Sequence, residues 1–145
     1  MSKKVLIPCC ALLTFSLVGC VTTINPSTER NLDHLKDKNW VVSEIQGEKL
    51  VADPSKSNVP SIRFDSERVS GTDGCNRFMG GYTVKGTEIQ LSKLASTEMA
   101  CLNASDTPKK FSQALQQVTQ YDASDKELKL LDASKKVLLK FDAAQ

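Results

Sequence analysis

The sequence has little of the chemistry on which enzymes and metal sites usually depend. Its 145 residues include one histidine, His34, and five cysteines. A catalytic serine or cysteine normally needs a histidine base beside it, and a structural zinc site needs four nitrogen or sulfur ligands. A single histidine near the start of the chain is a poor candidate for either role. We therefore expect a protein that is not an enzyme, with no catalytic residue, no metal and no cofactor.

The sequence also has no apolar run suited to an ordinary membrane-spanning helix. The run from Val5 to Val18 is too short and wrongly flanked, but with Lys3 and Lys4 before it, it follows the plan of a signal peptide. Residues 17–20, Leu-Val-Gly-Cys, resemble the lipobox of bacterial lipoproteins. We therefore expect residues 1–19 to be a lipoprotein signal peptide and Cys20 to carry acyl chains, palmitate among them. The alternative is an ordinary signal peptide with a chance cysteine.

The expected anchor predicts where the protein resides. One acyl chain binds a membrane only marginally, at about 0.8 kcal/mol per buried CH₂, whereas the lipoprotein modification carries several chains. Val21, rather than an aspartate, follows the cysteine, which by the sorting rule of enteric lipoproteins indicates the outer membrane. We expect a lipid-anchored outer-membrane protein whose domain faces the periplasm. Residues 20–31 are interpreted as the lipidated N-terminus and tether, and residues 32–145 as one domain.

Net charge and aromatic residues are both scarce in the expected mature chain. Loss of Lys3 and Lys4 reduces the 19 basic residues to 17, equal to the 17 acidic residues. The mature chain is then formally neutral and has no strong field to attract nucleic acid. Aromatic residues make up 6% of the sequence, and neither a run of Lys and Arg nor a set of stacking aromatics stands out. We expect no nucleic-acid partner.

The cysteines that remain predict a disulfide. Cys9 and Cys10 leave with the signal peptide and Cys20 takes the lipid, so Cys75 and Cys101 are left as an isolated pair. In an oxidising compartment such a pair normally forms a disulfide. Closing a loop of about 26 residues stabilises a domain by roughly 3 kcal/mol in the chain-entropy model. The pair lacks the Cys-x-x-Cys spacing of a redox site.

Short segments with alternating apolar residues predict an antiparallel sheet. In residues 61–65, for example, Ile62 and Phe64 point to one face while Ser61 and Arg63 point to the other. Lys85-Gly86 lies between two such segments and predicts a hairpin turn. The expected strands lie around residues 39–45, 48–51, 61–65, 67–71, 82–84, 87–91, 127–131 and 136–141.

One amphipathic helix is predicted after residue 106. Thr107 can cap it and Pro108 suits its first position. Apolar residues then recur at helical spacing, at Phe111, Ala114, Leu115 and Val118. We expect this helix to pack on the apolar face of the sheet. Binding to a partner is the less common alternative for such a helix.

The glycine-rich stretch GTDGCNRFMGGYT, residues 71–83, could in principle bind a phosphate or a nucleotide, but it lacks the known glycine motifs for such sites. It has neither the lysine of a phosphate-binding loop nor the G-x-G-x-x-G spacing of a dinucleotide site. A structural interpretation remains, with Phe78 packing in the sheet. Asn76 and Arg77 are the polar side chains that could form a binding site. The alternative is that Asn76 bonds local backbone and Arg77 is a solvated strand residue.

This stretch also carries a family resemblance. Gly-Cys-Asn-Arg-Phe at residues 74–78, followed by Thr-x-Met-Ala-Cys at residues 97–101, resembles the META domain of HslJ-like bacterial lipoproteins, over about residues 32–141. The resemblance implies an α+β fold with a strongly curved antiparallel sheet, half-barrel-like, and one packed helix. It also implies links to heat shock, the stress response and novobiocin resistance. It implies no catalytic residue set.

Three functions follow as hypotheses. The leading one is a non-enzymatic outer-membrane lipoprotein that supports envelope integrity and tolerance of stress or novobiocin. A second is a protein-binding or escort module for an envelope or secretion protein, for example through strand addition at a sheet edge. A third is a carrier of a lipid or another small molecule.

Overall fold

The computed structural model describes residues 26–50, 58–101 and 105–144. The expected signal peptide, Cys20 and the first part of the expected tether lie outside these residues. The described elements are, in chain order, α1 (Pro26–Leu35), β1 (Asn39–Ile45), β2 (Glu48–Lys49), β3 (Ser61–Phe64), β4 (Arg68–Thr72), β5 (Arg77–Lys85), β6 (Glu88–Leu91), β7 (Ala95–Ser96), α2 (Thr107–Leu115), β8 (Gln120–Ala123), β9 (Glu127–Leu131) and β10 (Val137–Ala143).

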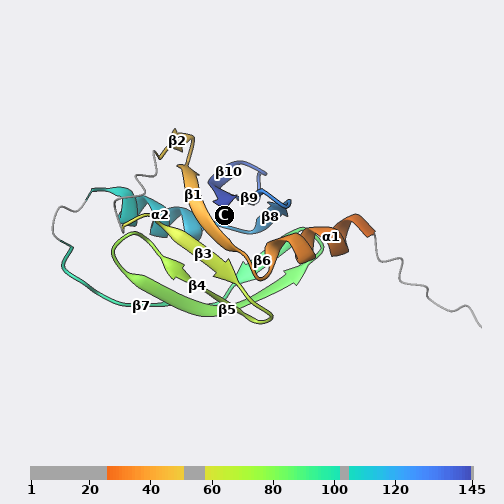
Figure 1. Cartoon of the computed structure of the whole chain (residues 1–145), viewed down its shortest axis with the longest axis horizontal. Helices are drawn as coiled ribbons and strands as arrows, with labels where there is room; N and C mark the ends of the chain where they lie inside the picture. The colour runs from red at the N-terminus through yellow and green to blue at the C-terminus, as the bar shows by residue number, and fades with distance from the viewer. Residues whose placement is uncertain (1–25, 51–57, 102–104, 145) are drawn as a thin grey trace, which may run out of the picture.

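Eight of the described strands form a closed antiparallel barrel, as Figure 1 shows. Going around it, the order is β1, β3, β4, β5, β6, β8, β9 and β10, and β10 pairs again with β1. The expected antiparallel, curved sheet is confirmed. The expected half-barrel is wrong, because the seven-residue β10 pairs with β9 on one side and β1 on the other. Register shifts in both pairings mark the bends that let the sheet close.

The barrel wall is thinnest where β6 meets β8. These strands share one residue pair, Glu88 with Gln120. Two backbone hydrogen bonds flank it, from Ile89 N–H to Thr119 O and from Tyr121 N–H to the β5–β6 turn. Every other neighbouring pair of barrel strands shares at least three residue pairs. The wall is therefore held least firmly at this seam.

Apolar side chains fill the inside of the barrel. Alternate residues point inward in strands such as β3, β8 and β9, as expected for a half-buried sheet. The largest fully buried side chains are Trp40, Tyr121, Phe64, Phe111, Phe141, Leu35, Ile62, Leu128, Leu130 and Leu139. The expected inward positions at Ile62 and Phe64 are confirmed. The barrel encloses a packed core.

The two helices pack at opposite ends of the barrel (Figure 1). The ring of Phe111 in α2 lies 5.8 Å from the ring of Phe78 in β5 and 6.3 Å from that of Phe141 in β10, measured between centroids. The predicted helix is thus confirmed, and it packs on the core. Its N-cap residue is Asp106 rather than Thr107, which is already helical. The helix ends at Leu115, before the buried Val118.

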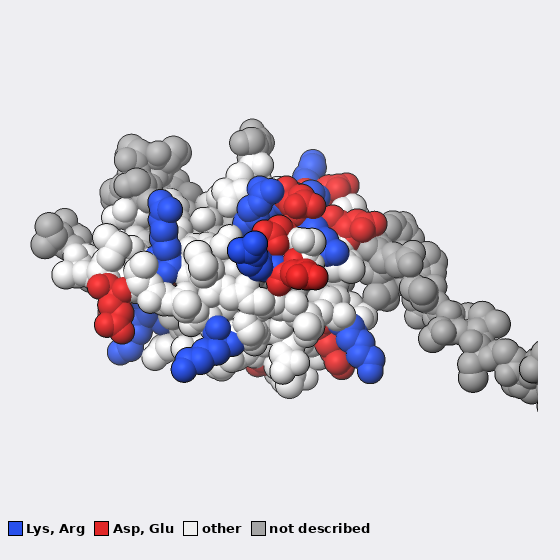
Figure 2. Space-filling view, turned by 90° about the horizontal axis from the view of Figure 1, so that it is seen from below, with Lys and Arg blue, Asp and Glu red and all other residues white. Residues whose placement is uncertain are grey.

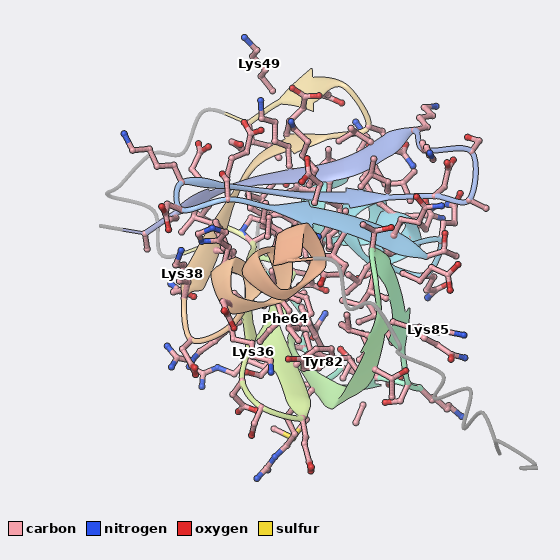
Figure 3. All side chains as sticks on the ribbon, turned by 90° about the vertical axis from the view of Figure 1, so that its right-hand side faces the viewer. Lys36, Lys38, Lys49, Phe64, Tyr82 and Lys85 are labelled. Atoms are coloured by element: carbon pink, nitrogen blue, oxygen red, sulfur yellow. A yellow bond between two sulfur atoms is a disulfide. The ribbon has the colours of Figure 1, made fainter. Side chains whose placement is uncertain are left out.

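Helix α1 was not predicted from the sequence, because its polar composition suggested a tether. It lies across the other end of the barrel, next to Phe64 and Tyr82 (Figure 3). Asn31 Oδ1 accepts a hydrogen bond from Ala123 N–H at 2.6 Å, and Leu35 is fully buried. The fold is therefore mostly β with two short helices, rather than α+β with one. In the described part of the chain, neither helix has the length and apolar character that a membrane span needs.

Most of the predicted strands are present, with shifted ends. The hairpin between β5 and β6 turns at residues 86–87, one residue later than expected, with Gly86 at φ 65°. β5 begins at Arg77, five residues before the predicted start. The short strands β7 and β8 were not predicted.

Candidate functional site

The glycine-rich loop is organised around a buried aspartate, Asp73. Its side chain is 5% exposed. Its Oδ1 accepts hydrogen bonds from the N–H groups of Cys75 and Asn76 at 2.8 and 2.6 Å, and its Oδ2 accepts a longer one, 3.4 Å, from Ser112 of α2. Gly74 completes the turn at φ 96°, a conformation that suits glycine. The loop is an Asx turn that fastens β4, β5 and α2 together.

Asn76 takes a structural place in this loop. Its side-chain Oδ1 accepts a hydrogen bond from Met99 N–H at 2.8 Å and a longer one from Thr97 Oγ1 at 3.4 Å. Thr97 in turn pairs with Arg77, donating its N–H to Arg77 O and accepting the Arg77 N–H at its Oγ1. Asn76 therefore holds residues 97–99 against the start of β5.

The structure contains the expected disulfide between Cys75 and Cys101, whose Cα atoms are 5.9 Å apart. It closes a separation of 26 residues. It joins the Asx turn to the end of the same segment that Asn76 holds. The turn, Asn76 and the disulfide thus form one structural unit, which explains why the two halves of the family motif occur together.

Arg77 and Phe78 point to opposite sides of β5. Phe78 is buried and contacts α2, so its expected packing role is confirmed. Arg77 is exposed on the outer face, where Met79, two residues on, is 60% exposed. Figure 2, seen from the side that β4, β5 and β7 occupy in Figure 1, shows a wide area of uncharged surface beside a cluster of mixed basic and acidic side chains. The structure places Asn76, Arg77 and Phe78 in three different environments and does not bring them together as a pocket.

A groove of about 1070 Å³ lies at the thin part of the barrel wall. One side is formed by β6 and residues 92–96, and the other by the C-terminal half of α2 and residues 118–120. Its apolar lining consists of Phe78, Ile89, Leu91, Leu94, Leu115 and Val118. Polar side chains, Gln90, Ser92, Gln116 and Gln120 among them, line the rest. The groove was not predicted.

His34 lies far from this groove, in α1. Its Nδ1 is 2.9 Å from Asp125 Oδ1 in the β8–β9 turn. Lys38 Nζ reaches the same carboxylate at 3.3 Å, and its hydrogen bond, together with the neighbouring His34, holds the pKa of Asp125 below its ordinary value. The contact fastens α1 to the barrel. Within the described residues, no three His, Cys, Asp or Glu side chains gather as potential metal ligands.

Ion pairs or burial within the fold also shift the pKa values of Glu127, Tyr121 and Tyr82. Lys129 and Lys140, each 2.8 Å from a Glu127 carboxylate oxygen, hold the pKa of Glu127 below its ordinary value. Burial in the core raises the pKa of Tyr121 to about 12. Burial also raises the pKa of Tyr82, with Asp65 and Asp37 nearby. None of these groups lines the groove.

The sequence pattern that defines the META domain matches residues 33–145. The chain belongs to the META domain family. It is distantly related to heat shock protein HslJ of Escherichia coli (strain K12), which is 25% identical over 130 residues covering 88% of this chain and 89% of that protein. The resemblance inferred from the cysteine motif is thereby confirmed.

Solved structures of other proteins have a similar fold. One NMR structure, 25% identical, covers 76% of this chain and 92% of its own, with a TM-score of 0.61. Another, of a protein from Burkholderia xenovorans, is 18% identical and covers 92% of this chain and 99% of its own, with a TM-score of 0.63. The second likeness bears on the fold alone.

Sequence reasoning missed two parts of this META domain. The first part is the turn at Asp73. Asp73 is followed by Gly74, and that dipeptide is a turn signal, but it does not indicate that the aspartate side chain is buried. The groove residues are ordinary strand and helix residues with no local signature. They meet because β6 and α2 are adjacent in space, which no short motif encodes.

Proposed function

We propose that this META domain protein is a non-enzymatic, lipid-anchored outer-membrane protein that supports envelope integrity under heat and antibiotic stress, novobiocin included, and that it acts by binding. The observation that carries this proposal is the use of the motif's polar groups. The side chains of Asp73 and Asn76 accept backbone hydrogen bonds that build the loop. The groove is then the surface best suited to binding. The related HslJ protein is named a heat shock protein, which agrees with a role in heat stress.

The proposed anchor places one end of the domain near the membrane. Five residues lie between Cys20 and Pro26, where α1 begins, so the two are six residue steps apart. An extended chain of that length spans at most about 20 Å. The end of the barrel covered by α1 therefore faces the membrane in this proposal. The groove opens in the barrel wall between the two ends, where a periplasmic partner can reach it.

The test is complementation of a deletion strain. Wild-type protein should restore survival under heat and novobiocin and should fractionate with the outer membrane, whereas Cys20→Ala should leave the membrane fraction and restore survival poorly. Cys9→Ala is the matched control, because Cys9 lies in the expected signal peptide and should be dispensable. Equal survival of deleted and complemented strains under every envelope stress would remove the support for the stress role. Retention of Cys20→Ala in membranes would contradict the anchor.

Small-molecule carriage is the second candidate, favoured by the size of the groove. Ligand sites usually measure about 300–1,000 Å³ and are mostly apolar, and the groove, at about 1070 Å³, is large enough. The barrel interior itself is filled by buried apolar side chains. Native mass spectrometry of the protein purified from membranes should then show a retained small molecule. A mass equal to that of the lipidated chain alone would count against carriage.

A further inference from the structure

We propose that the groove receives an extended polypeptide segment, which adds as a β-strand to the open edge formed by β6 and β7. The segment has apolar residues at alternate positions and at least one acidic residue. This proposal rests on the proposed binding function and specifies its partner class and surface. It differs from carriage of a small molecule because backbone hydrogen bonds are part of recognition.

The first observation is an unused strand edge beside the groove. In an antiparallel strand, successive residues direct their N–H and C=O groups to opposite sides. Ser92 N–H donates to Gly81 O on β5, so the backbone groups of Leu91 point away from β5. Thr97 N–H donates to Arg77 O, so those of Ser96 also point away. Leu91 and Ser96 both line the groove.

The neighbouring strand that would normally cover this edge stops early. Within the described residues, β6 pairs with β8 at Glu88 alone, and β7 pairs only with β5. β8 begins at Gln120, and the chain before it leads to α2. The gap left by β8 is the groove. An added strand lies about 4.8 Å from its neighbour, and it would continue the ladder where β8 leaves it.

The second observation is the apolar floor beneath that edge. Side chains of an added strand point alternately to either face, so every second one would meet Leu94, Leu115 and Val118. Leu94 is kept over β5 by the glycine beneath it, because a Cβ at Gly80 would lie 2.6 Å from Leu94 Cδ2. The side chains facing outward would meet the polar rim. The partner therefore needs apolar residues at alternate positions rather than at helical spacing.

The third observation is the charge around the groove. Lys85 and Lys93 line it together with one acid, Glu88. Lys85 extends away from the barrel at the tip of the β5–β6 hairpin (Figure 3). In the part of the chain that the structure describes, neither lysine forms an ion pair. The lining contributed by α2 is uncharged. The unpaired lysines favour an acidic residue in the partner.

The experiment uses the full lipidated chain in detergent micelles and a phage-displayed library of random dodecapeptides. Selected peptides should show alternating apolar residues and at least one Asp or Glu. Their binding should slow hydrogen exchange at the amides of Leu91 and Ser96. Selected peptides that lack the alternation, or that protect other amides, would overturn the proposal. A library that yields no peptide above background would also overturn it.

One pair of variants separates backbone recognition from simple apolar contact, and one double variant tests the charge preference. Leu91→Pro removes an N–H that β5 does not use, so it should weaken peptide binding about tenfold, whereas Leu91→Ala keeps that N–H and should weaken it less. The double variant Lys85→Glu, Lys93→Glu should lose acidic peptides and gain their lysine-substituted versions. If Leu91→Pro does not fold, this double variant still tests whether peptides bind beside the two lysines of the groove. Equal binding by both Leu91 variants, or no charge preference, would refute strand addition.

Failure of this proposal and failure of the proposed function are distinguishable in cells. If Leu91→Pro abolishes peptide binding but still restores survival of the deletion strain, the envelope role stands and strand addition is irrelevant to it. If neither wild type nor variant affects survival while peptides bind as expected, the strand-addition site stands and the stress role falls.

Discussion

Asp73 gives the sharpest test of whether the loop at residues 73–78 is part of the fold or a site. Its buried side chain accepts the N–H groups of Cys75 and Asn76. Asp73→Ala removes the acceptor for both hydrogen bonds at once. Asp73→Asn keeps one acceptor oxygen, and asparagine suits the same turn. We therefore expect alanine to destabilise the domain strongly and asparagine to destabilise it much less.

The size of the effect follows from the burial of the two donors. A buried N–H left without a partner costs about 1–3 kcal/mol. The residues Cys75 and Asn76 are half-buried, so water satisfies their N–H groups in part and the lower half of that range applies to each. For Asp73→Ala we expect a loss of about 2–4 kcal/mol in the free energy of unfolding, and for Asp73→Asn about 1 kcal/mol. A domain of this kind has roughly 5–15 kcal/mol in total.

Urea unfolding followed by tryptophan fluorescence measures this loss. Trp40 is the single tryptophan and is buried, so its emission reports the integrity of the barrel. The matched control is Asp132→Ala, because Asp132 accepts backbone hydrogen bonds from Ser134 and Lys136 in an exposed hairpin turn. We expect the control to lose less. If the Asp73 and Asp132 variants were equally stable while only Asp73→Ala lost stress tolerance, the loop would be a functional site and the reasoning would be refuted.

Three further predictions use the same unfolding assay. Replacing Cys75 and Cys101 by serine should lower the free energy of unfolding by about 3 kcal/mol. The control is Ser70→Ala at an exposed position, and an equally small loss for the cysteine variant would contradict the role of the disulfide. Phe111→Ala empties a fully buried position and should lower it by about 3–5 kcal/mol, against little change for the exposed Gln113→Ala. The pKa of Glu127 is lower in the folded than in the unfolded protein, so its stabilisation is present above the ordinary value of 4.5 and is lost as the pH falls through the folded pKa. Glu127→Gln should therefore be less stable than wild type at about pH 7 and equally stable at about pH 2, and a difference that persists in acid would exclude this linkage.

Local patterns in the sequence were enough to place most of the elements. Alternation at Ile62 and Phe64 located β3, and the helical spacing that begins at Phe111 located α2. These patterns work because burial on one face leaves a repeat of two or about 3.6 residues in the sequence. The two-residue strand β7 is too short to show such a repeat and was missed for that reason. β8 has the same length and the same alternating burial as β3, with Tyr121 and Ala123 buried, so its pattern was present in the sequence but was overlooked.

Closure of the barrel could not be inferred from the same patterns. It depends on the pairing of β10 with β1, whose partners Trp40 and Ala143 lie at opposite ends of the domain sequence. Alternation states which face of a strand is buried but not which strand lies beside it. A half-barrel and a closed barrel therefore have the same sequence signature. The register shift between Val42 and Glu44 is likewise visible only in the pairing.

In the candidate site, too, local sequence patterns indicated individual residues but not their contacts with distant parts of the chain. Asn76 was recognised as a candidate, with local backbone bonding as the alternative, but its partners Thr97 and Met99 lie more than 20 residues away. Because of these distant partners, Asn76 and the Cys75–Cys101 disulfide act as a clamp that holds residues 97–101 to the start of β5. Arg77 is exposed, as the alternative interpretation expected. The role of Asp73 was missed, because the signal of its turn is common to many loops.

The clamp fixes the chain segment that forms one side of the groove. Asn76 and the Cys75–Cys101 disulfide hold residues 97–101 to the start of β5. The segment that begins with Ser92 is therefore fixed at β6 on one side and at the clamp on the other. Held in this way, it keeps Leu94 over Gly80 and stays apart from α2, so the groove remains open. The family motif can thus matter for binding without any of its side chains contacting a partner, because it positions the edge that a partner would use.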